Sequence, residues 1–236
     1  MTERYVVGLT ALATPIEVEA KALAADLGTT VYEERLKLTA GVPLLALSTT
    51  DGAAARDLVA KLRARGHRAQ LCRSSEVVPA AAMTVLRHFT FDADGLDSGA
   101  DQLPWDDVSA LIQARHHVHT EKTATIKERK FDLGRAVMTG GLMTSKTSKR
   151  EVVTTTDDVE HVLYLFRASG ETPWLLREHG TNYSCLGARL DPTSARNFAT
   201  TVELFRAHAP HARFDDSLSR RPIKEADLFA RLIAKG

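Results

Sequence analysis

Residues 4–28 read RYVVGLTALATPIEVEAKALAADLG and predict a β-strand that leads into an amphipathic helix. Arg4–Thr10 contains the β-branched pair Val6 and Val7, which favours a strand. After Pro15, apolar residues recur with helical spacing and would form one buried face, namely Ile16, Ala20, Leu23, Ala24 and Leu27. Thr14 and Glu17 have the spacing of a capping box, and Gly28 is a typical helix stop. This stretch therefore predicts the first β–α unit of a mixed domain.

The next fifty residues extend this pattern and complete a first domain over residues 1–80. Val31–Thr39 alternates apolar and charged residues, which predicts a half-exposed strand. Pro43–Ser48 predicts a short strand, Asp51 is suited to cap a helix that ends at Gly66, and His67–Cys72 predicts a last strand. The resulting order resembles the ferredoxin-like βαββαβ sandwich. This resemblance implies a fold class and no particular activity, because such folds serve many functions.

Residues 84–212 predict a mainly β second domain. The expected strands are Leu86–Phe91, Leu103–His119, His161–Ala168, Pro173–Glu178 and Asn182–Leu186. A closing helix would start at Asp191 and Pro192 and stop at Pro210, with an inward stripe formed by Phe198, Val202, Phe205 and Ala209. Strands followed by one closing helix, together with the sequence Leu103-Pro104-Trp105-Asp106-Asp107-Val108, resemble bacterial pleckstrin-homology-like domains. The chain is thus expected to be an α+β protein in which residues 120–160 form a long insertion into this second domain.

Residues 213–236 are expected to form a polar link, Ser217–Arg221, and a C-terminal amphipathic helix over Lys224–Lys235. The apolar side of that helix would consist of Leu228, Phe229, Leu232 and Ile233. Two interpretations stay open. The helix docks on its own protein, or it is offered to a partner or to a second copy.

Positive charge is concentrated in the insertion. Between Lys122 and Arg150 there are eight basic residues and two acidic ones, so this segment carries about +6 in a protein of net charge +1. Such a segment favours an anionic partner, such as phospholipid, nucleic acid or an acidic protein surface. It also contains Phe131, Leu133, Val137, Met138, Leu142 and Met143, and exposed methionine and leucine beside arginine suit an adaptable protein contact. The alternative is a solvated loop or hairpin arm whose charges only keep it soluble.

Two motifs in or near the insertion point to chemistry that their context does not support. Gly140–Thr147 resembles a phosphate-binding loop, but Ser145 occupies a position that requires glycine. The residues that follow, Val152–Thr156, are β-branched and do not favour the helix that would hold a phosphate. His116, His117 and His119 could include metal ligands on a strand, yet no cysteine or glutamate lies at a diagnostic spacing. We therefore expect no metal, no cofactor and no catalytic residues.

Composition restricts the classes of protein to which this chain can belong. The chain has 236 residues, is 44% hydrophobic and 26% charged, and contains two cysteines, Cys72 and Cys185, which are too far apart for a zinc motif and are expected to be free thiols. No apolar run is long enough for a membrane span, and residues 5–13 are too short and polar for a secretory signal. A cytoplasmic location is therefore expected.

These observations favour a non-catalytic regulatory or adaptor protein that acts by protein–protein contact, for example on a nucleotide-binding signalling protein such as a small GTPase. The alternatives are a peripheral binder of anionic membrane or nucleic acid through residues 122–150, and an enzyme of unrecognised type. The expected contact residues are Lys127, Arg129, Lys130, Arg135, Lys146, Lys149, Arg150, Met138, Leu142 and Met143. The oligomeric state is left open.

Overall fold

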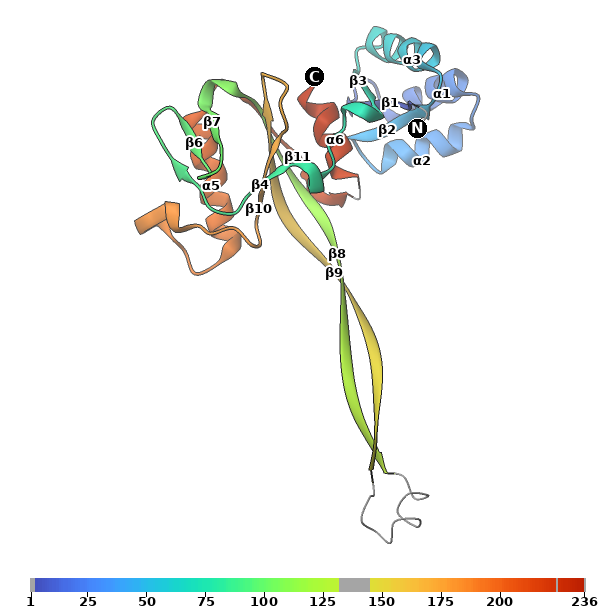
Figure 1. Ribbon diagram of the computed structural model, residues 1–236. Helices are drawn as coiled ribbons and strands as arrows, with labels where there is room; N and C mark the ends of the chain where they lie inside the picture. Colours follow the sequence, from blue (N-terminus) through green and yellow to red (C-terminus); the bar gives the residue numbers. More distant parts are fainter. Residues whose placement is uncertain (1–2, 132–144, 224, 236) are drawn as a thin grey trace. The chain divides into compact units, whose positions relative to one another are not determined.

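The computed structural model describes residues 3–131, 145–223 and 225–235, with the side chains of 117–158 and 221–223 left out of the description. The fold is mixed α+β with several sheets (Figure 1). Contacts divide the chain into two compact units, one made of Met1–His116 with Glu160–Gly236 and one made of His117–Val159. The predicted domains, residues 1–80, 84–212 and 213–236, stay a prediction.

The N-terminal region contains a three-stranded antiparallel sheet in the order β2-β1-β3. Its elements are β1 Tyr5–Ala11, α1 Ile16–Leu27, α2 Val31–Thr39, β2 Leu44–Thr49, α3 Gly52–Ala64 and β3 Arg68–Arg73. Val7 and Leu9 of β1 pack into a core formed with the helices, whereas Val6 belongs to a different core. Successive residues of β1 are thus buried on opposite sides of the sheet.

Helix ends in this region follow the sequence signals in part. Gly28 ends α1 in the left-handed conformation, and Asp51 caps α3 by accepting hydrogen bonds from the backbone N–H groups of Ala53 and Ala54. The capping box predicted at Thr14 is wrong, because Pro15 is the N-cap residue of α1 and makes no side-chain cap. The hydroxyl oxygen of Thr14 is buried without a hydrogen-bond partner.

The strand predicted over Val31–Thr39 is wrong, because these residues form α2. A capping box explains the difference: the Thr30 hydroxyl accepts from the Glu33 backbone N–H while the Glu33 carboxylate binds back to Thr30. Leu38 is buried on the inner side of the helix, whereas Tyr32 and Leu36 are 69% and 63% exposed. The described N-terminal sheet therefore has three strands, and the ferredoxin-like arrangement is not confirmed.

The remaining strands form a five-stranded sheet in the order β11-β8-β9-β10-β4 and a small antiparallel sheet β5-β6-β7. Their bounds are β4 Thr84–Leu86, β5 Thr90–Phe91, β6 Gly95–Asp97, β7 Gln102–Pro104, β8 Val108–Phe131, β9 Ser145–Arg167, β10 Trp174–Arg177 and β11 Arg213–Ile223. The helices of this part are α5 Ser194–His208 and α6 Ala226–Ala234, with 3-10 turns at Ser74–Glu76, Ala80–Ala82, Trp105–Asp107 and Ser184–Arg189. Two of the pairings are parallel, β4 with β10 and β8 with β11. The pleckstrin-homology-like arrangement is not confirmed.

Some local predictions for this part of the chain agree with the structure and others do not. The β9–β10 hairpin is confirmed, with Trp174 opposite Leu165. The inward stripe of the closing helix is also confirmed, since its four predicted residues are buried in one core. The strand predicted at Asn182–Leu186 is wrong because a 3-10 turn begins at Ser184, and the predicted link Ser217–Arg221 lies within β11.

Helix α6 docks on its own chain. Its buried residues Phe229, Leu232 and Ile233 share a core with Val6 and Cys72 of the N-terminal sheet and with residues of β8 and β9. Gly8 makes room for this contact, because a Cβ atom at that position would lie 2.5 Å from a methyl carbon of Leu232. Helix α6 thus packs against both the N-terminal sheet and the five-stranded sheet.

Candidate functional site

The most unusual elements of the fold are the two strands β8 and β9, of 24 and 23 residues. Strands in globular proteins usually have 3–10 residues. The pairing of β11 with β8 ends at His116, and that of β10 with β9 ends at Val162. From His117 to Phe131 and from Ser145 to Val159 the two strands continue as neighbours. We call these two strand segments the ribbon (Figure 1).

The ribbon contains most of the contact residues that the sequence predicts. Lys127, Arg129 and Lys130 lie in β8, and Lys146, Lys149 and Arg150 lie in β9. The described part of the structure does not include their side chains. The other four predicted contact residues lie outside the described residues, namely Arg135, Met138, Leu142 and Met143. The structure thus brings two clusters of predicted residues onto neighbouring strands.

The secondary structure of the ribbon bears on the phosphate-loop motif. Residues 145–147 begin β9, and Val152–Thr156 continue the same strand, whereas a phosphate-binding loop requires a helix at this point. Residues 140–144 lie outside the described residues. His116, His117 and His119 lie in β8. Among the described residues, no group of three or more His, Cys, Asp or Glu side chains is arranged to hold a metal.

A second feature is a buried charge network in the N-terminal region. Glu19 of α1 is fully buried and accepts hydrogen bonds from the Arg65 guanidinium at 2.8 and 3.1 Å. The His67 ring lies with Nε2 2.5 Å from Glu19 Oε2, the oxygen that also accepts from Arg65 Nε, while its Nδ1 accepts from the Ala13 backbone N–H at 3.0 Å. Because Nδ1 is an acceptor, the proton of the neutral ring is on Nε2 and is donated to Glu19. Both ring nitrogens are therefore occupied, and this network holds α1 against α3 and β3 rather than exposing a base.

A third feature is a cavity of about 140 Å³ beside α6. The segment after β3, the β9–β10 turn and one side of α6 enclose it, and its charged lining residues are Glu76, Arg167, Glu171, Asp227 and Arg231. Phe166 and Met83 contribute an apolar floor. We call this space the α6 cavity.

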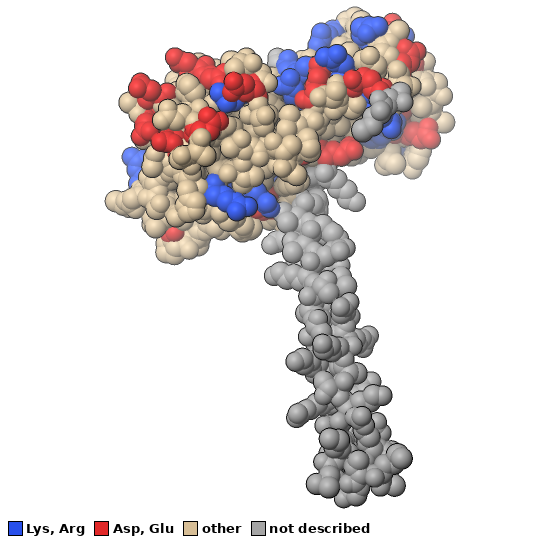
Figure 2. Space-filling model, viewed as in Figure 1, with Lys and Arg blue, Asp and Glu red and all other residues tan. Residues whose placement is uncertain are grey.

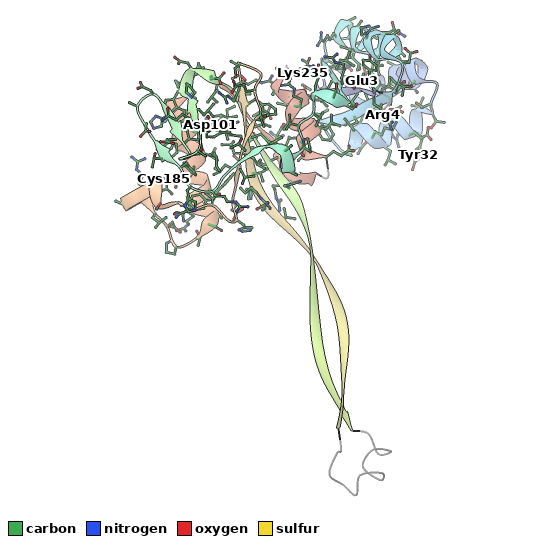
Figure 3. The ribbon with its side chains drawn as sticks, in the orientation of Figure 1. Glu3, Arg4, Tyr32, Asp101, Cys185 and Lys235 are labelled. Atoms are coloured by element: carbon green, nitrogen blue, oxygen red, sulfur yellow. The ribbon has the colours of Figure 1, made fainter. Side chains whose placement is uncertain are left out.

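Two carboxylates of the α6 cavity have strong internal partners. Burial would raise the pKa of Glu76, but hydrogen bonds from Lys235 and from the backbone N–H of Arg73 lower that pKa to about 2. Lys235 is labelled in Figure 3, and its Nζ lies 2.6 Å from Glu76. Asp227 accepts from the Tyr164 hydroxyl at 2.7 Å and from the Ala80 backbone N–H at 2.8 Å. Burial, and then the nearby Asp227 charge, raise the pKa of Tyr164, which therefore stays a neutral donor.

Surface charge on the described part is uneven. Residues 90–107 contain six aspartates and no lysine or arginine, and acidic side chains gather on the visible face of the part formed by β5–β7 (Figure 2). Of these aspartates, Asp107 is paired with Arg167 at 2.6 Å. An anionic partner would be repelled by this acidic segment, whereas residues 122–150 carry about +6.

Sequence reasoning did not identify the Glu19 network or the α6 cavity. Glu19 lies between apolar residues of a helix that was otherwise assigned correctly, and this position was the only available signal. The α6 cavity joins three segments that are distant in sequence, so no local pattern reports it. Cys72 and Cys185 are both free thiols as predicted, and Cys72 is buried whereas Cys185 is half-buried.

Comparisons of this chain with protein-family models, with curated proteins and with solved structures find no match. Within the described residues, no helix combines the length and apolar character needed to cross a bilayer. The site must therefore be interpreted from its own geometry and charge.

Proposed function

We propose that this chain is a non-catalytic regulatory or adaptor protein that binds a protein partner through the ribbon. The observation that carries the proposal is the length of β8 and β9, which continue as a pair beyond the strands that flank them. At about 3.3 Å per residue, the part of β8 after His116 spans roughly 50 Å. This is much more backbone than the five-stranded sheet requires.

Backbone chemistry makes such a ribbon suitable for binding. A strand without a neighbour on one side presents unpaired N–H and C=O groups, which can pair with an extended segment of another protein. A two-stranded ribbon is also only marginally stable alone in water. Binding a partner would therefore add hydrogen bonds and buried surface area to the ribbon.

Charge defines the class of partner. Residues 122–150 carry about +6, and the rest of the chain therefore carries about −5, so an acidic protein surface would approach the ribbon in preference to the acidic β5–β7 region. In a narrower form of the proposal the partner is a nucleotide-binding signalling protein, and Arg129 or Arg135 approaches its phosphates. As parts of the same hypothesis, we propose that the first domain is ferredoxin-like and the second pleckstrin-homology-like. We also propose that the protein is cytoplasmic.

The test is partner capture from a lysate of the source cells, comparing the wild-type chain with one lacking residues 122–150 and with the quadruple variant Lys127→Ala, Arg129→Ala, Lys130→Ala and Arg135→Ala. Captured proteins are identified by mass spectrometry, and binding is then measured with each purified candidate. The matched control replaces four exposed basic residues elsewhere by alanine, namely Lys21, Arg35, Arg56 and Arg189. We expect loss of the partner in both ribbon variants and retention in the control. Unchanged capture by the quadruple variant would contradict the proposal.

A second candidate function is binding of nucleic acid, which the two-stranded form of the ribbon favours. The major groove of B-DNA is about 12 Å wide and admits a two-stranded β-ribbon. Binding by the same residues to an anionic membrane is the other form of this alternative. Both forms predict a steep loss of affinity between about 50 and 200 mM salt. Duplex and vesicle binding measured over that range distinguish them from a protein contact, and no binding at the lowest salt would exclude both.

A further inference from the structure

The α6 cavity contains one charged group whose hydrogen bonds the described residues do not complete. Glu76 is bonded by Arg73 and Lys235, and Asp227 by Tyr164 and Ala80. Arg167 is bonded to Asp107 and Glu171, at 2.6 and 2.5 Å. All these lining groups therefore have partners within the fold.

Arg231 differs from them. Its Nε is buried and has no hydrogen-bond partner, and no ion pair of its guanidinium is found among the described residues. The guanidinium lies over the Phe166 ring, 5.9 Å from the ring centre. A guanidinium has five N–H donors in a planar fork, and a carboxylate with two oxygens is its natural complement. Arg231 thus lines the cavity with a guanidinium for which no hydrogen-bond acceptor is found among the described residues.

The other lining charges restrict which carboxylate can enter. Three acidic side chains and two basic ones line the α6 cavity, so a simple anion meets a net negative wall. A molecule that also carries a positive group would instead be attracted by that wall. Glu171 is suited to receive this group because its side chain is 63% exposed and its only described ion pair, with Arg167, uses one carboxylate oxygen, Oε2.

Size restricts the ligand further. Pockets for drug-sized molecules measure about 300–1,000 Å³, whereas the α6 cavity measures about 140 Å³. We propose that the α6 cavity binds a small zwitterion, a free α-amino acid with a short side chain, with its carboxylate on Arg231 and its ammonium group toward Glu171. This inference is independent of the ribbon.

The test measures binding to the full-length chain by calorimetry and by the thermal unfolding midpoint. Glycine, alanine and serine are the zwitterionic probes, and acetate and methylammonium represent each half of the ligand alone. A ligand with so few atoms is expected to bind in the millimolar range. We expect at least one amino acid to bind and to raise the unfolding midpoint, with much weaker effects of acetate and methylammonium. Absence of binding by all three amino acids would overturn the proposal, because water alone then fills the cavity.

Variants assign the binding to the two charged groups. Arg231→Gln should weaken amino-acid binding at least tenfold, whereas Arg56→Gln, at an exposed position on α3, should leave it unchanged. Glu171→Gln should weaken binding of amino acids several-fold and leave any weak binding of acetate the same or stronger. Because Glu171 is exposed, this variant keeps the test decisive if Arg231→Gln does not fold. Equal binding of acetate and alanine, or full binding by either cavity variant, would overturn the proposal.

Discussion

Glu19 in the N-terminal region is fully buried and Arg231 in α6 is partly exposed with a buried Nε, and the described residues complete the bonding of only the first. The Glu19 carboxylate is bonded by Arg65 and His67, and the His67 ring is fixed by the backbone of Ala13. The Nε of Arg231 has no described partner and borders a cavity. A buried charged group whose hydrogen bonds are all made within the protein, here called a closed network, stabilises the fold. A group with unused donors can instead bind a ligand.

The largest expected effect comes from breaking the closed network. Glu19→Ala leaves the Arg65 guanidinium without its main partner and the His67 ring without an acceptor. Removal of one partner from a buried pair typically costs about 3–5 kcal/mol, and we expect a loss of this size in the free energy of unfolding measured with urea. Glu17→Ala is the control, because Glu17 is an exposed carboxylate on the same helix and should change stability by about 0.5 kcal/mol or less. A similar small loss for both variants would mean that the network is not closed in solution.

The next effect concerns the helix that carries Arg231. Leu232→Ala removes a fully buried side chain from the core between α6 and the N-terminal sheet, which should cost about 2–4 kcal/mol. Gly8→Ala should cost about 1 kcal/mol alone, because the added methyl group would meet Leu232. In the Leu232→Ala background the same change should cost nothing, since the space is then open. A double-mutant cycle measured by urea unfolding that shows additive losses would contradict direct packing of Leu232 on Gly8.

Acid should weaken the attachment of the C-terminal end of α6. Glu76 has a folded-state pKa of about 2, below the ordinary value of 4.5. The unfolded chain therefore takes up the proton first as the pH falls, and the contribution of Glu76 is present above about 4.5 and is lost as the pH approaches 2. Because Glu76 is one fifth exposed, we discount the full shift and expect this contribution to be about 2 kcal/mol.

Urea unfolding at two pH values isolates this contribution from that of other carboxylates. Glu76→Gln should cost about 2 kcal/mol at neutral pH and much less at pH about 3. Glu203→Gln is the control, because its ion pair with Arg206 is at the surface and should add no pH-dependent difference. An equal cost of Glu76→Gln at both pH values would show that the Lys235 contact does not form.

Sequence patterns predicted the elements of this fold best where one local signal dominated. Asp51 and Gly28 marked helix ends correctly, and the apolar stripe of α5 was read from its period alone. Val31–Thr39 failed because its alternation competed with the capping signal at Thr30 and Glu33, and the helix then left Tyr32 and Leu36 exposed. A hairpin arm in the insertion was left open only as an alternative, and the extent of the β8–β9 pairing was not predicted, since register between distant strands is not encoded in the period of either strand.

The ribbon and the α6 cavity also differ in how far the sequence alone reveals them. The basic residues of the ribbon were visible as a count of charges, because proximity in sequence was enough to reveal them. Arg231 looked like an ordinary polar residue of a terminal helix. Its significance depends on the carboxylates that line the same cavity, because Glu76 and Asp227 already accept from Lys235 and Tyr164. These contacts join residues that are distant in sequence, so only the structure reveals them.

The smallest expected effect on stability comes from Arg231→Met, which keeps the length of the side chain and its contact with Phe166 while it removes the charge and the N–H donors. Because the described structure gives these donors no acceptor, their removal should change the free energy of unfolding by about 0.5 kcal/mol or less, or raise it. Urea unfolding at neutral pH checks this, with Glu19→Ala as the reference for a charge whose partners are complete. A loss of about 3 kcal/mol in Arg231→Met would place Arg231 in a closed network as well. The contrast between the two charges would then disappear, and with it the reason to expect a ligand in the α6 cavity.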